Sequence, residues 1–192
     1  MRKFSRTVAL YAGIAMLLGG GLVALFFFGP RWLATPPSPD TQQAAPAPVD
    51  ARKIRARLFY VNEQGTALTS VEQEVIYGEG IVEQAKRIVE AQLASPQQPL
   101  ASAIPPDTKL RTVFVTSAGD TYVDLSGEVQ KNHPGGATNE ILTVYAVVAA
   151  LTTNLPAITS VQILVEGREV DTLAGHFDLR RPIESDAKWI TD

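Results

Sequence analysis

The stretch KIRARLFYVNEQGTALTSVEQEVIY, residues 53–77, decides the fold class of this chain. From residue 53 to residue 60, apolar side chains mostly alternate with charged ones, a period of two that is typical of a half-buried strand. A turn at the Gln-Gly pair, residues 64–65, folds the second half of the stretch back on the first. Apolar residues then share one face and opposite charges meet on the other, as a sheet surface requires. The predicted cross-strand pairs are Ile54–Val75, Arg55–Glu74, Arg57–Glu72 and Leu58–Val71.

Two helices are predicted after this hairpin. Apolar residues recur at helical spacing over residues 80–95, where a Ser-Pro pair ends the pattern. A second, strongly apolar helix covers residues 139–156, with Asn139 or Thr138 as its N-cap.

Two more hairpins complete the predicted domain. The first turns around an Ala-Gly pair and places Phe114 on the same face as Val123. The second turns around a Gly-Arg pair, which sets Val165 opposite Val170. The predicted fold is therefore α+β, with two helices packed on a largely antiparallel or mixed sheet in the order β-β-α-β-β-α-β-β.

The N-terminal region contains a membrane-spanning candidate. Residues 8–28, VALYAGIAMLLGGGLVALFFF, form a run without a charged residue. A helix of this length spans about 31 Å, the thickness of a bilayer core. Arg2, Lys3 and Arg6 precede the run, which favours a cytoplasmic N-terminus and an exported remainder. The alternative is a signal peptide cleaved near Thr35, but the run is longer than a signal core and ends in phenylalanines.

Four parts of the chain are predicted. Residues 1–7 are cytoplasmic, residues 8–29 form the transmembrane signal-anchor helix, residues 30–51 form a Pro/Ala-rich linker, and residues 52–192 form the exported domain. The linker lacks apolar periodicity and cannot build a core. The exported domain has 13 Lys/Arg and 18 Asp/Glu, a net charge that argues against a nucleic acid as partner. The chain has no cysteine, so it forms no disulfide.

The last hairpin carries a dense set of acid, base and ligand-type side chains. In VQILVEGREVDTLAGHFDLRRPI, residues 161–183, four acidic residues accompany His176. A metal site needs three or four converging ligands, and the other histidine, His133, lies in a separate glycine-rich loop. A Ser-His-Asp triad could be drawn from Ser126, His176 and Asp124, but no nucleophile elbow surrounds Ser126. We therefore predict no catalytic residue, no metal and no cofactor.

These side chains are expected to stabilise loops instead. Asp124 and Ser126 end a strand, where such residues hydrogen-bond loop backbone. Gly175 permits a turn that other residues resist, and His176 is expected to bond neighbouring backbone after it. The residues expected in structural motifs are Asp124, Ser126, Asn139, Glu140, Gly167, Gly175, His176 and Asp178.

Three stretches of the chain carry a family resemblance: LFYVNEQG (residues 58–65), PPDTKLRTVFVTSAGDTYVDLS (105–126) and NEILTVYAVVAALTTNLPAITSVQILVEGREVDTLAGHFDLRRPI (139–183). They resemble the GerMN domain of bacterial sporulation and germination proteins, which also occurs in envelope lipoproteins. The resemblance implies an exported, membrane-tethered interaction module near the cell wall or in envelope assemblies, and it brings no catalytic residues. Many members are lipoproteins, whereas this chain has no cysteine to carry a lipid.

The expected function is that of a single-pass protein of the bacterial cytoplasmic membrane with its C-terminal domain outside. That domain is expected to bind another envelope protein or a cell-wall component without catalysis. One alternative is an accessory or catalytic component of a cell-wall-active enzyme, which a pocket with converging ionisable groups would favour. The other is a structural module that forms homo-oligomers through its sheet edges.

Overall fold

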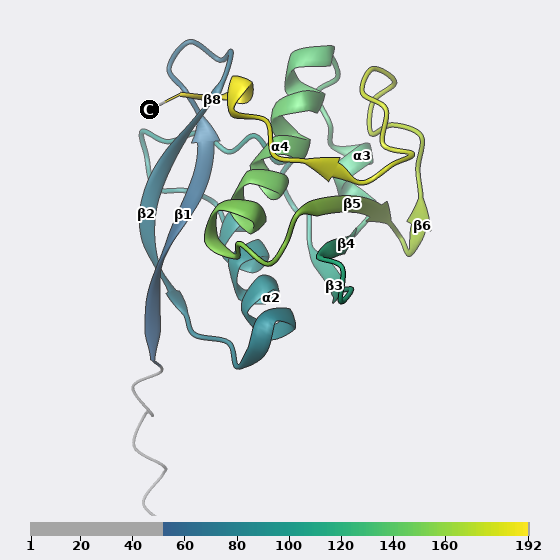
Figure 1. Cartoon of the computed structure of the whole chain (residues 1–192). Coiled ribbons are helices and arrows are strands. Elements are labelled where there is room, and N and C mark those ends of the chain that lie inside the picture. Colours follow the sequence, from purple (N-terminus) through teal and green to yellow (C-terminus); the bar gives the residue numbers. More distant parts are fainter. Residues whose placement is uncertain (1–51, 192) are drawn as a thin grey trace, which may run out of the picture. The chain divides into compact units, whose positions relative to one another are not determined.

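The computed structural model describes residues 52–191, which form an α+β domain (Figure 1). The predicted transmembrane helix and linker lie outside the described residues. Among the residues described, no helix is long and apolar enough to cross a membrane. The elements in chain order are β1 (Lys53–Val61), β2 (Leu68–Ile76), α2 (Gly80–Leu93), β3 (Leu110–Val115), β4 (Asp120–Leu125), α3 (Glu128–Lys131), α4 (Ala137–Asn154), β5 (Ser160–Val165), β6 (Arg168–Glu169), β7 (Ile183–Glu184), η2 (Ala187–Trp189) and β8 (Ile190–Thr191).

Strands β1 and β2 form the first predicted hairpin, and all four predicted cross-strand pairs are confirmed. The inward face of β1 carries Ala56, Leu58 and Tyr60, which are almost completely buried. The outward face carries exposed ion pairs, such as Lys53 Nζ to Glu74 Oε2 at 3.0 Å. Burial of these side chains and solvation of the charged ones on the other face hold this hairpin in its register, although Phe59 and Leu68 of that other face are also buried.

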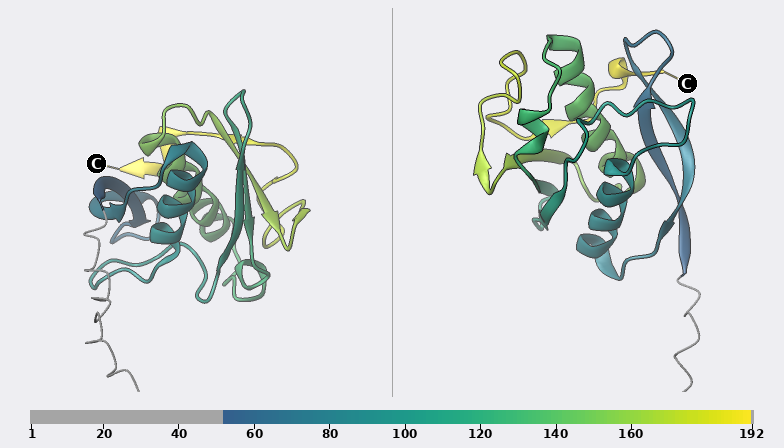
Figure 2. Two further views of the ribbon diagram at one scale, coloured as in Figure 1. Left: turned by 90° about the horizontal axis from the view of Figure 1, so that it is seen from below. Right: turned by 180° about the vertical axis from the view of Figure 1, so that it is seen from behind.

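The strands form two sheets, so the prediction of a single sheet is wrong. The first has the order β1-β2-β8 and the second the order β3-β4-β5-β6, with β7 also paired to β5. Strands β4 and β5 run parallel, because the chain crosses back through α4 between them. Helices α2 and α4 lie between the two sheets (Figures 1 and 2). The α+β class and the mixed strand directions are confirmed.

Helix α4 is buried nearly all round because sheets lie on both sides of it. Every residue from 142 to 151 is buried. A helix that is apolar on all faces is typical of such a position. It begins at Ala137, and its N-cap is Gly136 without a side-chain capping bond, so the predicted cap at Asn139 or Thr138 is wrong. The positive φ of Gly136, 86°, turns the chain into the helix at this earlier point.

The second hairpin, β3–β4, is confirmed, but its predicted register is off by one residue. Val113 pairs with Val123, and Phe114 pairs with Tyr122. Gly119, with φ at 94°, adds a residue to the turn and so reverses which side chains share a face. Phe114 is therefore 60% exposed, and its ring lies 6.3 Å from that of Tyr122.

The third hairpin, β5–β6, is also confirmed with a shifted turn. Val165 lies opposite Arg168 rather than opposite Val170. The turn residues are Glu166 and Gly167, with φ of 52° and 74°. Two consecutive positive φ values define a type I′ turn, which matches the twist of the flanking strands. The sequence suggested a turn beginning with glycine, whereas Glu166 takes the first left-handed position.

Candidate functional site

A buried carboxylate, that of Glu140, organises the loop that follows the third hairpin. Glu140 lies in the first turn of α4 and is fully buried. Its Oε1 accepts hydrogen bonds from the backbone N–H groups of Leu173 at 2.6 Å and Ala174 at 2.9 Å. Its Oε2 accepts one from the N–H of His176 at 2.8 Å. The positive end of the helix dipole favours a negative charge at this position.

The backbone of the loop is shaped to present these N–H groups. Gly175 has φ at 95°, which glycine adopts readily and other residues resist. Its own N–H donates to Thr172 Oγ1 at 2.9 Å, which closes the turn. Successive N–H groups that point to one centre form an anion-binding concavity. Here the anion is the protein's own Glu140 carboxylate, so the concavity is filled from within.

Two histidines lie near enough to Glu140 to interact with its charge. His176 Nδ1 is 3.4 Å from Glu140 Oε2, while the His176 side chain stays 46% exposed. His133 accepts a hydrogen bond from the N–H of Gly135 at its Nδ1, at 2.9 Å. Its Nε2 lies 3.3 Å from Thr143 Oγ1. Because Nδ1 of His133 is an acceptor, the proton of the neutral ring is on Nε2.

The surroundings set the charge state of this cluster. Burial by itself would raise the pKa of the Glu140 carboxyl, but backbone N–H donors outweigh it, and the pKa lies below its usual value. Burial lowers the pKa of His133, and the neighbouring Glu140 opposes that shift only in part. At neutral pH, Glu140 is therefore ionised and His133 is neutral.

A second network ties the end of β4 to the β5–β6 turn. Asp124 Oδ1 accepts from the N–H of Gly167 at 2.7 Å, and its Oδ2 accepts from Arg111 Nε at 2.9 Å. Arg111 also pairs with Glu166, whose Oε1 accepts from the N–H of Gly127 at 2.8 Å. Asp124 and Gly167 were each expected in a structural motif, and they are in fact hydrogen-bonded to each other.

The other expected motif residues make local contacts. Ser126 Oγ accepts from the N–H of Lys109 at 3.0 Å. Asn139 Nδ2 donates to the carbonyl of Gly135 at 2.8 Å. Asp178 accepts from Arg180, and this guanidinium holds the pKa of the Asp178 carboxyl well below its usual range.

The arrangement does not assemble the alternative chemistry that the sequence left open. Within residues 52–191, no group of three His, Asp or Glu side chains could hold a metal ion. The triad candidates bond elsewhere: Ser126 to Lys109, Asp124 to Gly167 and Arg111, and His176 to Glu140. The side chains of Ser126 and Asp124 therefore hold backbone or a neighbouring side chain in place, whereas His176 bonds Glu140 through its backbone N–H.

Two carboxamides that were not predicted from the sequence form hydrogen bonds along the edge of β1 that faces away from β2. Gln92 in α2 donates to the carbonyl of Phe59 at 2.7 Å and accepts from its N–H at 2.8 Å. Asn154, the last residue of α4, does the same for Arg57, at 2.7 and 2.9 Å. A signal was present for Gln92, which follows Ile88 by four positions and so lies on the apolar face of its helix.

Comparison with known proteins agrees with this fold. A family model described as "Germane: Sporulation and spore germination" matches residues 57–171. A Clostridium perfringens structure described as a "putative lipoprotein" is 26% identical, with a TM-score of 0.50 over 70% of this chain and 89% of that chain. Curated protein sequences show no match to this chain.

Two structures of the Bacillus subtilis sporulation protein GerM are also similar. Its first GerMN domain has a TM-score of 0.53 at 18% identity, over 68% of this chain and 97% of that chain. Its tandem GerMN domains have a TM-score of 0.53 at 16% identity, over 71% of this chain and 47% of that chain. At such low identity these two matches establish similarity of fold.

Proposed function

Because the chain belongs to the Germane, or GerMN, family of sporulation and spore germination domains, we propose that it is a membrane-tethered, non-catalytic binding protein of the bacterial envelope. The apolar run over residues 8–28 would tether it, and the proline-rich linker would set the reach of the exported domain. The similar Clostridium perfringens protein, described as a lipoprotein candidate, supports a place at a membrane.

The observation that carries the proposal is the state of Glu140. A carboxylate that acts as a general acid or base must reach a substrate proton. Glu140 is fully buried, and its oxygens already accept three backbone hydrogen bonds. It is therefore occupied with holding the loop of residues 171–179. An exported domain whose buried acid supports a loop is better suited to presenting a surface than to catalysis.

The test is a wall-hydrolysis assay on the full chain in detergent micelles. Isolated bacterial sacculi are incubated with the protein, and soluble wall fragments are measured beside a known muramidase. We expect no fragment release. Release of fragments that His176→Ala abolishes, with unchanged thermal melting, would overturn the proposal and favour an enzyme. Asp124→Asn serves as a second variant, because it probes the other network with the same readout.

A further inference from the structure

The two outer edges of the first hairpin differ in a way that matters for binding. The outer edge of β1 is closed by Asn154 at Arg57, by Gln92 at Phe59, and by the carbonyl of Ala101, which accepts from the N–H of Val61 at 2.9 Å. The outer edge of β2 is paired with β8 only at Leu68 and Thr69. Within the described residues, no strand pairs with residues 70–76 of β2 on the side away from β1.

The backbone groups on this open edge point outward at alternate residues. The N–H and C=O of Arg57 and Phe59 point away from β2, because they bond Asn154 and Gln92. Their cross-strand partners are Glu72 and Ser70. In an antiparallel pair, both residues of such a non-bonded pair direct their backbone groups outward. The residues of β2 whose N–H and C=O groups point away from β1 are therefore Ser70, Glu72, Glu74 and Ile76.

A groove runs along the inner side of this edge. It has a volume of about 610 Å³, and residues 71–74 line it from β2, so Glu72 and Glu74 border it as well. Its other wall is the end of α2 and the proline-rich loop after it, residues 94–100. Side chains of an added strand alternate between two faces, so every second one would enter this groove.

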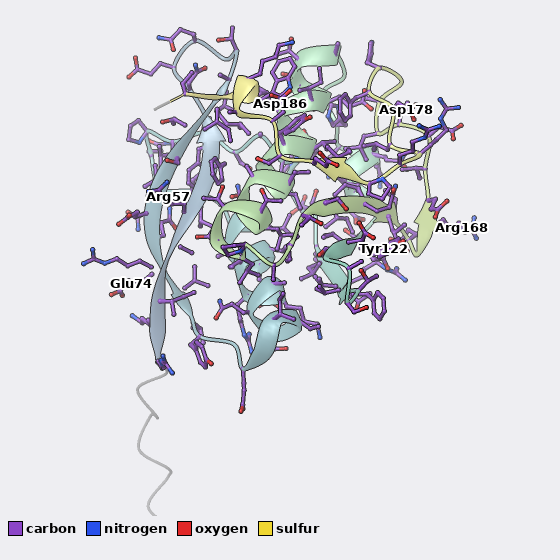
Figure 3. The ribbon with its side chains drawn as sticks, in the orientation of Figure 1. Arg57, Glu74, Tyr122, Arg168, Asp178 and Asp186 are labelled. Carbon is purple, nitrogen blue, oxygen red and sulfur yellow. The ribbon has the colours of Figure 1, made fainter. Side chains whose placement is uncertain are left out.

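The charges on the outer face of this edge favour an added strand with basic side chains. Glu72 and Glu74 are exposed there, and Glu74 points away from the helices (Figure 3). Lys53 and Arg55 neighbour them from the β1 side, with ion-pair distances of 3.0 and 3.9 Å. A strand added on the other side would place its own outward side chains beside the two glutamates. Opposite charges at such positions stabilise a sheet, whereas like charges destabilise it.

A second copy of β2 does not satisfy this requirement. In the antiparallel registers that overlap residues 70–76 most fully, a glutamate of one copy faces a glutamate of the other. Acidic side chains on an exposed edge discourage pairing with neutral or acidic strands. They do not discourage a basic strand.

From the open edge, the groove and the two glutamates, we propose that β2 binds an extended segment of a partner protein that joins the sheet as a strand. The segment carries Lys or Arg at alternate positions, opposite Glu72 and Glu74, and small or apolar side chains between them. This inference rests on the proposed binding function and names the chemistry of the partner. Backbone hydrogen bonds supply affinity in such strand addition, and the alternating side chains supply selectivity.

The test uses the full chain in detergent micelles and two fluorescent peptides, one alternating Lys and Val and one alternating Glu and Val. Fluorescence anisotropy measures binding at peptide concentrations up to roughly millimolar. Even weak specific recognition is detectable in this range. We expect the basic peptide to bind, and the acidic peptide to bind at least about tenfold more weakly. The variant Glu72→Lys/Glu74→Lys should reverse this preference. The control Glu63→Lys/Glu169→Lys, with the same net charge, should retain it.

Hydrogen exchange distinguishes strand addition from general charge attraction. On binding of the basic peptide, the amides of Ser70, Glu72 and Glu74 should gain protection, because added-strand carbonyls would accept their protons. Absence of binding, binding without this protection, or equal loss in both double variants would overturn the inference. None of these results would bear on the proposed function, which fails separately if the chain hydrolyses sacculi.

Discussion

At the level of single residues, Glu140 determines how the chain leaves the third hairpin. Removing a carboxylate from water is costly unless hydrogen bonds replace the lost hydration. Leu173, Ala174 and His176 provide that replacement through their backbone N–H groups. The contact also joins the first turn of α4 to a loop more than thirty residues later in the chain.

We expect Glu140→Gln to lower the free energy of unfolding by about 1–3 kcal/mol at neutral pH, because an amide nitrogen would face N–H donors. The pKa of Glu140 is lower in the folded protein than its ordinary 4.5. Its stabilising effect is therefore complete above that ordinary value and is lost as the pH falls through the folded value. Urea unfolding across this range should show the gap between wild type and variant narrowing with acid. A gap that stays constant would contradict the assignment.

His176→Ala should be mild, with a loss under about 1 kcal/mol, because the bond to Glu140 comes from the backbone N–H, which alanine keeps. The imidazole itself is half exposed and 3.4 Å from the carboxylate. The sequence led us to expect that the His176 side chain bonds backbone. Its contacts indicate a smaller role for this side chain in stability. Equilibrium unfolding of the variant checks this, and a loss above about 2 kcal/mol would assign the role to the ring.

At the level of elements, the first hairpin packs one set of side chains against the helices, and the backbone groups at the outer edge of β1 are hydrogen-bonded. Its inward side chains contact the helices, while carboxamides from α2 and α4 occupy the backbone groups of β1. These carboxamides make the hydrogen bonds that a neighbouring strand would make, so the backbone groups of Arg57 and Phe59 are satisfied without one. The β5–β6 side of the molecule, with Arg168 and Asp178, lies away from this hairpin (Figure 3).

Leu58→Asp should unfold the domain, because Leu58 is fully buried and a charge there would cost several kcal/mol without a partner. The exchange Arg57→Glu with Glu72→Arg should be tolerated, because both side chains are exposed and surface charge interactions contribute about 0–1 kcal/mol. Thermal melting of the full chain followed by circular dichroism compares the two. Equal stability of Leu58→Asp and the wild type would mean that this face is not packed.

Gln92→Met keeps the side-chain volume but leaves the N–H and C=O of Phe59 without partners. Because Gln92 is fully buried, we expect a loss of about 2–4 kcal/mol. Asn154→Ala should cost less, because Arg57 is exposed and water can replace the carboxamide. Denaturant unfolding of both variants tests the order. A larger effect of Asn154→Ala would show that burial does not set the cost.

At the level of the whole molecule, α2 and α4 separate two sheets, and each sheet packs against them from one side (Figure 2). This arrangement explains why α4 is apolar all round and why Lys53, Arg55, Arg57, Glu72 and Glu74 on the outer face of the first hairpin are exposed. The faces away from the helices are left to solvent or to partners. The open edge of β2 belongs to one of those solvent-facing regions.

The proposed tether makes a prediction about the full chain in cells. The protein should remain in the membrane fraction after alkaline washing, because a helix over residues 8–28 would cross the bilayer. Protease added to spheroplasts should degrade the domain, which is expected outside. Recovery of a soluble mature chain that begins near Thr35 would contradict the anchor and indicate a cleaved signal peptide.

The sequence by itself determined the local elements wherever one face of a strand is buried. Alternation in residues 53–77 specified the first hairpin to the residue, because a one-residue slip would bury Arg57 and expose Leu58. The second hairpin has apolar residues in both alternation sets, so alternation could not select its register, and the positive φ of Gly119 decided it. Periodicity also located α2 and the apolar helix α4.

The tertiary structure alone decided which elements pack together and which polar groups meet. Local periodicity gives the buried face of an element but not its neighbour, so it did not separate one sheet from two. The contacts of Glu140 with residues 173–176, and of Gln92 with Phe59, join positions more than thirty apart in sequence. Such pairs depend on how the helices cross the sheets, and only the complete fold brings their donors and acceptors within hydrogen-bonding distance.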